Sequence, residues 1–204
     1  MDFDAAVAAM AEMSTAIISD AMFRMGNKDR TMRARIKPVD PSMKVAGPAC
    51  TAHAYPGATY ASGLAMEAAK PGDVIVIDAQ GVLEAIMWGE IFSTMAMVKG
   101  VAGTIVDGAV RDIAEIKELG YPLFGAGVHP AAGTSDKLGK VNIPIQCGGV
   151  VVRPGDYVFG DLLGVVVVPP EELLDVYAWC EDVLAKEAKI KADLHEQLKA
   201  KGLR

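Results

Sequence analysis

The residues best suited to chemistry lie in the stretch GTIVDGAVRDIAEI at positions 103–116. Arg111 and Asp112 stand side by side between an apolar run typical of a buried strand and a run with helical spacing. Asp107 lies near the end of the strand-like run. Open α/β sheets usually bind ligands where a buried strand ends and a helix begins. The stretch therefore predicts a binding or catalytic site.

Asp112 also has a structural interpretation. Together with Glu115 it forms a D-x-x-E pattern that resembles a capping box, followed by a buried stripe and by Gly120 as a helix stop. Taken alone, this local pattern favours a helix cap, but it leaves Asp107 and Arg111 unexplained. The two interpretations are compatible, because a side chain that begins a helix can also direct an oxygen towards a ligand.

Glu90 adds a second acidic group at a fixed spacing. It begins the preceding helix-like segment, so that the chain reads E-x20-R-D-x2-E. The first N–H groups of a helix have no partner within the helix and bind anions readily. We therefore expect the amides of Gly89, Glu90 and Ile91 to be free donors beside Arg111 and Asp112.

Bulk properties exclude several classes of protein. The 204 residues carry a net charge of −6, which argues against a nucleic-acid groove, and we expect the basic stretch 28–37 to be a solvated loop. No run of about 18 apolar residues could span a membrane. The first residues, MDFDAAVAAMAEM, carry acids where a signal peptide carries bases, so we expect a soluble, cytoplasmic protein. Three dispersed cysteines predict buried free thiols.

Strand-like and helix-like segments alternate along the chain, which predicts a single α/β domain over residues 1–204 with a mixed sheet. In the helix at 88–100, Ile91, Met95 and Val98 share one face. From Pro170 the chain becomes helical to about Lys199, with a charged end suited to solvent or a neighbouring subunit. The other segments are helices at 2–13 and 15–25, strands at 44–55, 71–80 and 121–127, and three β-rich runs within 141–168.

Other chemistries find little support. The stretch GAGVHP at 125–130 has Pro130 where a dinucleotide-binding loop needs its third glycine, which also argues against a methyltransferase cofactor loop. Neither GxxxxGK[ST] nor GxSxG occurs. His53, His129 and His195 are isolated, so we expect packed or surface histidines rather than metal ligands.

A wider pattern surrounds these residues. The stretch WGEIFSTMAMVKGVAGTIVDGAVRDIAEIKELGYPLFGAGVHP resembles the core of the RraA-like family, and STAIISDAMFRMG, VAGPACTA, PGDVIVID, VNIPIQCGGVVVRPGDYVFGD and GVVVVP extend the resemblance over nearly the whole chain. The family includes class II 4-hydroxy-4-methyl-2-oxoglutarate/4-carboxy-4-hydroxy-2-oxoadipate aldolases. The resemblance implies an α/β/β/α sandwich with mixed sheets, of the swivelling-domain type, assembled as a homotrimer or hexamer with active sites between subunits.

The resemblance also assigns roles. Asp112 matches the aspartate that holds Mg²⁺ or Mn²⁺, largely through water, and Arg111 matches the arginine that pairs with a 2-oxo acid substrate. The amides of residues 89–95, among them Gly89, Ile91 and Phe92, match the loop that binds the pyruvate carboxylate. Arg111, Glu90 and Asp107 are expected to carry catalysis. Glu115, and Glu187 from an adjacent subunit, are expected outer acids.

The implied reaction is cleavage of a 4-hydroxy-2-oxo acid to pyruvate and a second oxo acid, with oxaloacetate decarboxylation as a companion activity. Both pass through a pyruvate enolate, whose charge a hard cation and an arginine would stabilise. Two other functions remain open within the family. One is a non-enzymatic regulator of ribonuclease activity that acts by binding a protein, and the other is a demethylmenaquinone methyltransferase.

Overall fold

The computed structural model describes residues 2–203. Its helices are α1 (Phe3–Glu12), α2 (Thr15–Arg24), α3 (Tyr60–Ala68), α4 (Glu90–Lys99), α5 (Ile113–Leu119) and α6 (Leu173–Ala200), the last preceded by a 3₁₀ turn, Pro170–Glu172. Its strands are β1 (Lys37–Pro38), β2 (Val45–His53), β3 (Val74–Asp78), β4 (Ile86–Trp88), β5 (Gly103–Val110), β6 (Leu123–Val128), β7 (Lys140–Val141), β8 (Ile145–Cys147), β9 (Val150–Val152), β10 (Tyr157–Asp161) and β11 (Gly164–Val168).

The main sheet is mixed, as predicted. Its order is β1-β6-β5-β3-β2-β10-β11, with β4 beside β5 and β7 beside β2. Strands β2, β3, β5 and β6 run parallel, whereas β10 is antiparallel to both β2 and β11. Strands β8 and β9 form a separate antiparallel hairpin. The parallel strands β3 and β5 are buried at every position, because both of their faces are covered.

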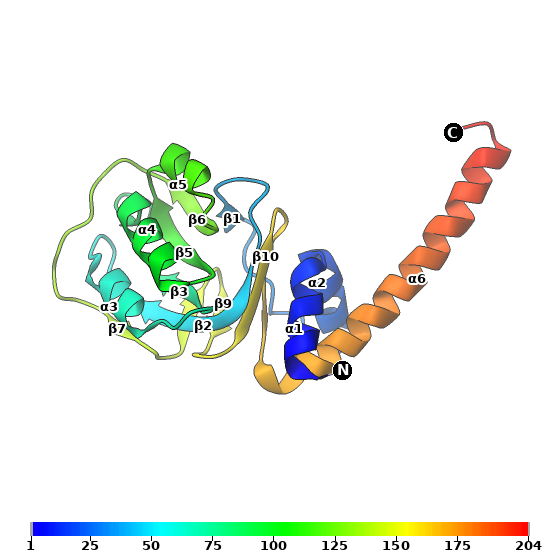
Figure 1. The fold of residues 1–204 in the computed structure, drawn as a ribbon, viewed down its shortest axis with the longest axis horizontal. Coiled ribbons are helices and arrows are strands. Elements are labelled where there is room, and N and C mark those ends of the chain that lie inside the picture. The colour runs from blue at the N-terminus through cyan, green and yellow to red at the C-terminus, as the bar shows by residue number, and fades with distance from the viewer. Residues whose placement is uncertain (1, 204) are drawn as a thin grey trace.

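Helices cover the strands on two sides (Figure 1), which gives the expected α/β/β/α sandwich. One apolar core lies between α3–α5 and the parallel strands, and includes Ile75, Ile77 and Trp88. A second lies between those strands and the β8–β9 hairpin, and includes Val76 and Ile105. A third joins β10 and β11 to α1, α2 and α6.

Helix α4 buries small residues and leaves most of its large apolar residues exposed. The buried residues of α4 are Ser93 and Ala96, whereas Ile91 and Val98 are 74% and 86% exposed. Met95, on the same face, is also exposed. Helix α4 begins two residues later than the helix predicted at 88–100, because residues 86–88 form strand β4. Helix α3 was not predicted at all.

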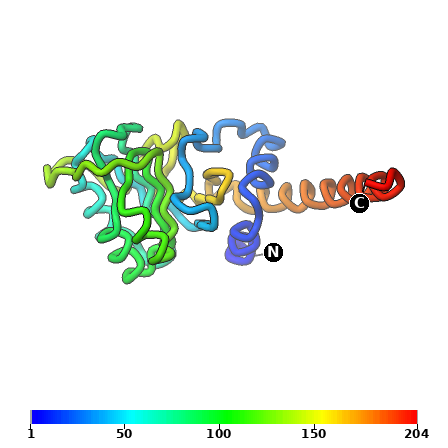
Figure 2. The backbone as a smooth tube through the Cα atoms, turned by 90° about the horizontal axis from the view of Figure 1, so that it is seen from above, coloured from blue at the N-terminus to red at the C-terminus, as the bar shows by residue number. Residues whose placement is uncertain are grey.

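Helix α6 packs through only its first half. Val176, Cys180 and Val183 are buried against α1 and α2, while Leu174 and Leu184 are exposed. The second half extends away from the rest of the chain (Figures 1 and 2).

Asp161 anchors the amino-terminal helices to the sheet. Its carboxylate accepts hydrogen bonds from the Thr15 N–H and hydroxyl, at 2.9 and 2.6 Å, and from the Leu163 N–H at 2.8 Å. Burial favours a higher pKa for Asp161, but these bonds and one from Ser14 hold the pKa below its ordinary value. Ser14 also caps α2, as its position in the sequence predicts.

Two expectations about bulk properties can be compared with the structure. All three cysteines are free and buried, as predicted. Within residues 2–203, none of the helices combines the length and the apolar character needed to cross a bilayer.

Candidate active site

The predicted site lies where β4, β5 and β6 end. The Arg111 N–H donates to the Trp88 carbonyl at 3.2 Å, and the His129 N–H donates to the Val110 carbonyl at 3.1 Å. These bonds hold residues 111–112 between the ends of two neighbouring parallel strands. The location is the carboxyl edge of a parallel sheet, where the sequence places it.

Asp112 caps a different helix from the one that the sequence predicts. It precedes α5, but its backbone is left-handed, with φ 58° and ψ 43°, and its side chain makes no capping bond to α5. The capping-box prediction with Glu115 is therefore wrong. Instead, Asp112 Oδ2 accepts the Glu90 N–H at 3.1 Å, so the carboxylate caps α4. Arg111 Nε lies 3.4 Å from the same oxygen.

Gly89 makes this close approach possible. A Cβ at residue 89 would stand 2.6 Å from Asp112 Oδ2 and 3.4 Å from Arg111 Cγ. Real Cβ atoms essentially never come within 3.0 Å of a non-bonded heavy atom, so any larger residue at position 89 would displace the carboxylate. The glycine is thus required by the position of Asp112 and not by its own backbone conformation, which is extended.

The first turn of α4 is held rigidly. The Trp88 indole N–H donates to Ser93 Oγ at 3.0 Å, and the Ser93 hydroxyl donates to the Gly89 carbonyl at 3.1 Å. The Trp88 ring stacks on Phe92 with 5.1 Å between ring centroids. Of the three amides expected to be free, that of Glu90 is occupied by Asp112. Among the described residues, none accepts the N–H groups of Ile91 and Phe92, which remain available to an anion.

Two pockets meet at Arg111 and Asp112. The α4 pocket, of about 210 Å³, lies beside the first turn of α4 and is also lined by Gly89, Ile91 and Phe92. The β6 pocket, of about 490 Å³, is lined by Arg111 and Asp112 together with Glu115 and His129. The structure therefore brings together Arg111, Asp112, the α4 amides and Glu115. His129 lies with them, although from the sequence we expect only a packed or surface histidine.

Two of the predicted acids are elsewhere. Glu90 is exposed at the first position of α4 and lines neither pocket. Glu187 pairs with Lys191 at 2.7 Å on the projecting half of α6. That half extends away from α4 and α5 (Figure 1), so within one chain Glu187 is remote from Arg111.

Asp107 faces the opposite side of the sheet from helices α3–α5. It pairs in register with Asp78. Alternate residues of β3 and β5 share one face of the sheet, and the set that includes these two acids faces the β8–β9 hairpin. Its carboxylate accepts the Gly148 N–H at 2.9 Å and binds Arg35 Nη2 at 2.7 Å. Asp107 thus lines neither pocket and ties the hairpin turn and residue 35 to β5.

Arg35 is a residue that sequence reasoning missed. We expected it to lie in a solvated basic loop, yet it pairs with a carboxylate that is only 4% exposed. A buried acid on a strand needs a compensating charge or hydrogen-bond donors. The acid at position 107 in a buried strand therefore indicated that a basic partner was required. Nearby, burial and then Asp107 and Asp78 raise the pKa of the Cys147 thiol well above its ordinary value.

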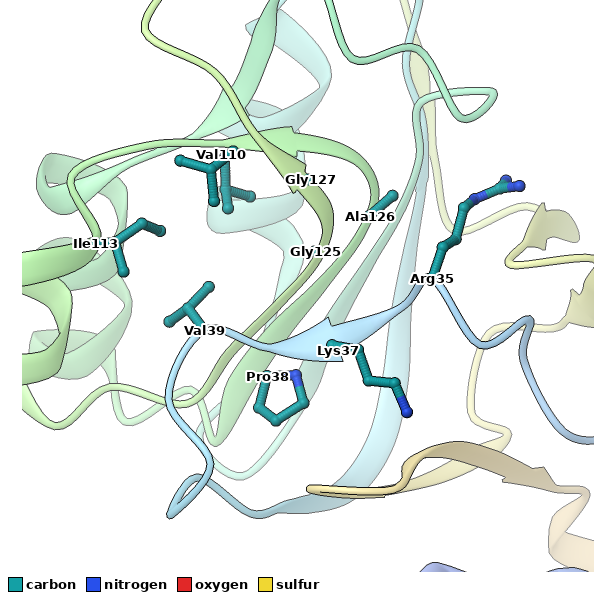
Figure 3. A pocket seen from close by; sticks show the side chains of 10 residues that line it. Arg35, Lys37, Pro38, Val39, Val110, Ile113, Gly125, Ala126 and Gly127 are labelled. Atoms are coloured by element: carbon teal, nitrogen blue, oxygen red, sulfur yellow. The ribbon is translucent and has the colours of Figure 1, made fainter.

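A third pocket, of about 250 Å³, lies between β1 and β6 (Figure 3). Val39, Val110 and Ile113 surround its apolar end, and the Arg35 side chain points away from it. Lys37, also at its edge, donates from Nζ to the Leu163 carbonyl at 2.6 Å. Both cations are thus engaged elsewhere, and the pocket has no charge suited to a 2-oxo acid.

The chemistry of Asp112 suits a divalent metal held through water. Within residues 2–203 there is no group of three or more His, Cys, Asp or Glu side chains that could hold an ion directly. Asp112 Oδ2 is occupied by Glu90 and Arg111, whereas Oδ1 accepts no hydrogen bond from the described residues. A hard carboxylate oxygen beside an open pocket matches Mg²⁺ or Mn²⁺, which keep several waters.

Comparisons with known proteins show the family of this chain. The model of the RraA-like family, described as aldolase/RraA, matches residues 15–167, and the chain belongs to this family. A protein of Halalkalibacterium halodurans named "Putative 4-hydroxy-4-methyl-2-oxoglutarate aldolase" is 42% identical over 179 residues, which cover 88% of this chain and 80% of that protein.

Two solved structures have the same fold. A protein from Pseudomonas syringae pv. tomato is similar with a TM-score of 0.84 and 26% identity, over 95% of this chain and 89% of that one. Streptomyces coelicolor RraAS2, described as an unusual member of the RNase ES inhibitor RraA protein family, has a TM-score of 0.81 and 28% identity, over 92% and 96%.

Proposed function

We propose that the protein is a divalent-metal-dependent lyase that cleaves 4-hydroxy-2-oxo acids to pyruvate and a second oxo acid, and that also decarboxylates oxaloacetate. The observation that carries the proposal is that Arg111 and Asp112 are shared by two adjoining pockets, one of which ends at free helix amides. The name of the 42% identical relative supports the same class of reaction.

Arg111 and α4 bind the end of the substrate that becomes pyruvate. The carboxylate accepts the N–H groups of Ile91 and Phe92, where the helix dipole also favours negative charge. The guanidinium of Arg111 then faces the 2-oxo group. Arginine remains charged throughout and offers several donors in a fixed plane, which suits a pair of adjacent oxygens.

Cleavage moves the C3–C4 bonding electrons onto the 2-oxo oxygen. The C4 hydroxyl loses its proton and becomes the carbonyl of the second product, while the remaining fragment is the pyruvate enolate. Arg111 stabilises the negative charge that develops on the enolate oxygen. Protonation of C3 by a water completes pyruvate, and we propose that Glu90, which stands outside both pockets at the start of α4, holds this water. In oxaloacetate the bond that breaks releases CO₂ instead.

A divalent cation held through water by Asp112 would supply further positive charge at the enolate oxygen and a water acidic enough, once deprotonated, to accept the C4 hydroxyl proton. Asp112 contributes the fixed negative charge, oriented by its bonds to Glu90 and Arg111. Glu115 lines the same pocket, where it can accept hydrogen bonds from the water around the ion. Asp107 positions β5 and touches no substrate.

Assembly of several chains would complete the site. Ile91, Met95 and Val98 form an exposed apolar face on α4, and Ile190, Leu194 and Leu198 form an exposed stripe on the projecting half of α6. Surfaces of this kind mark protein interfaces. We propose a homotrimer or a hexamer in which α6 of one chain brings Glu187 towards Arg111 of its neighbour.

The test is release of pyruvate from oxaloacetate in the presence of Mg²⁺. Wild-type protein is expected to turn over, and both Arg111→Ala and Asp112→Ala are expected to lose about 100-fold or more in kcat. Glu171→Ala is a matched control on the exposed 3₁₀ turn before α6 and is expected to retain wild-type turnover. Unchanged turnover in both site variants would remove the proposal.

The likeness to RraAS2 supports a second candidate, a regulator that inhibits a ribonuclease by binding it. A cleavage assay with an RNase E-type enzyme distinguishes the two functions. Inhibition that persists in the Arg111→Ala variant, together with no pyruvate release by wild-type protein, would favour the regulator.

A further inference from the structure

His129 is held beside Arg111 in a defined orientation. Its backbone N–H donates to the Val110 carbonyl at 3.1 Å, so it lies across from the residue that precedes Arg111. The side chain is half-buried and lines the β6 pocket together with Arg111 and Asp112. The histidine therefore belongs to the same site, although the sequence gives no motif that points to it.

One hydrogen bond fixes which ring nitrogen carries the proton. The Ala131 N–H donates to His129 Nδ1 at 3.1 Å. Nδ1 is therefore the acceptor nitrogen, and the neutral ring carries its proton on Nε2. Among residues 2–203, no acceptor binds His129 Nε2. His129 thus presents an unused N–H donor to the β6 pocket.

Donors are scarce in this pocket. Of the described side chains that line it, only Arg111 and His129 carry N–H groups, whereas Asp112 and Glu115 are acceptors and the others are apolar. A 2-oxo acid with a second carboxylate has acceptor oxygens at both ends and needs a donor for each. If Arg111 and the α4 amides bind the 2-oxo acid end, His129 is the donor left for the other end.

We propose that His129 is a specificity-determining residue whose Nε2–H binds the distal carboxylate of the substrate, so that the site selects dicarboxylates over their monocarboxylate analogues. This assignment rests on the proposed function, which places the 2-oxo acid end of the substrate at Arg111 and α4. It adds to that function the residue that recognises the second carboxylate of a 4-hydroxy-2-oxo dicarboxylate.

Binding of two stable probes tests the assignment independently of turnover. 2-Oxoglutarate and 2-oxopentanoate differ only in the carboxylate at C5, and neither has the C4 hydroxyl that aldol cleavage needs. Calorimetry with Mg²⁺ present is expected to show wild-type protein binding 2-oxoglutarate about tenfold or more tightly than 2-oxopentanoate, since a hydrogen bond to a charged group contributes this much.

Two variants separate recognition from a structural role. His129→Gln places an amide N–H near the position of Nε2 and is expected to keep most of the preference. His129→Asn can still accept the Ala131 N–H but cannot reach the position of Nε2, so its preference is expected to fall about tenfold. A purely structural histidine would give the reverse order, with Asn retaining and Gln losing the preference.

Each outcome has a separate consequence. Equal preference in wild type and His129→Asn overturns the role of His129, as does a wild type that binds both probes equally or neither. Absence of pyruvate release from oxaloacetate and from 4-hydroxy-2-oxoglutarate overturns the proposed function instead. Pyruvate release with an unaltered preference in His129→Asn leaves the aldolase standing and removes only the specificity role.

Discussion

Asp112 Oδ2 accepts the Glu90 N–H at 3.1 Å, so the carboxylate that begins one helix caps another helix 22 residues earlier in the chain. Residue 112 adopts a left-handed backbone to reach it. Such a conformation costs a non-glycine residue about 1–2 kcal/mol, although Asp and Asn adopt it more readily than other residues. Strain of this kind is concentrated at functional sites.

Asp112→Asn is expected to separate the charge of this residue from its capping role. The amide oxygen can still accept the Glu90 N–H, and Asn tolerates the left-handed backbone, so the free energy of unfolding should change by less than about 0.5 kcal/mol. Oxaloacetate turnover should fall by about 100-fold, because the negative charge that favours the cation is lost. Urea unfolding and a pyruvate assay measure the two effects. Asp112→Ala should lose turnover and also about 1–2 kcal/mol of stability. Wild-type turnover in the Asn variant would contradict the role given to the charge.

Gly89→Ala is expected to inactivate the protein without unfolding it. The added Cβ would meet Asp112 Oδ2 at 2.6 Å and push the carboxylate away from α4, so turnover should fall by at least tenfold. Circular dichroism should remain that of wild type. Gly63→Ala is the matched control, because nothing lies within 4 Å of its Cβ position. It should keep full activity and gain about 0.5–1 kcal/mol from better helix propensity in α3. Full activity in Gly89→Ala would show that the position of Asp112 is unimportant.

Asp161→Asn is expected to destabilise the protein by about 2 kcal/mol at pH 7. The Thr15 and Leu163 N–H groups donate to different oxygens of Asp161, so in either orientation an Asn amide would direct its NH₂ group at one of them. Chemical unfolding monitored by circular dichroism measures the loss.

The Asp161 effect should also depend on pH. Because the pKa of Asp161 is lowered in the folded protein, its ionisation stabilises the fold above the unfolded-state pKa of about 4. This contribution disappears as the pH falls through the folded-state pKa. The difference between wild type and Asp161→Asn should therefore shrink at pH 3. A difference that grows on acidification would refute the assigned shift.

Leu194→Asp is expected to weaken assembly. Leu194 is 51% exposed on the projecting half of α6, and a charge there would be buried at the proposed interface. Light scattering coupled to gel filtration should show a smaller species than wild type. Ala192→Asp adds the same charge on the opposite face of the helix and should leave the mass unchanged. Identical masses for wild type and Leu194→Asp would exclude this stripe as an interface.

The sequence predicts most of the fold, because the signals for it are local. The apolar run before Asp78 indicates a buried strand, and Ser14 indicates the start of α2. Helix α3 lacks such a signal, since Thr59 at its start makes no side-chain capping bond and Gly63 interrupts its interior. Strand β4 was not predicted, and its last residue, Trp88, was included in the predicted helix because it continues the apolar pattern of α4.

The site could be located from the sequence, but its partners could not be assigned. The position of Arg111 and Asp112 after a buried strand places them at the sheet edge. The D-x-x-E pattern cannot distinguish a carboxylate that caps its own helix from one that caps a neighbour, because the difference depends on the backbone at residue 112. The partners Arg35 and Asp107 lie 72 residues apart, a separation that no local spacing reveals.

The projecting half of α6 has a consequence for how the protein responds to dilution. Residues 184–200 extend about 25 Å at 1.5 Å per residue. An isolated helix of this length is only marginally stable in water, so in the proposed assembly contacts with a neighbouring chain would stabilise it. In that assembly, the helicity of α6, the association of the chains and the delivery of Glu187 would be linked by mass action. Below the dissociation concentration of the assembly, the far-ultraviolet signal of α6 and the specific activity should fall together, and both should return when the protein is concentrated.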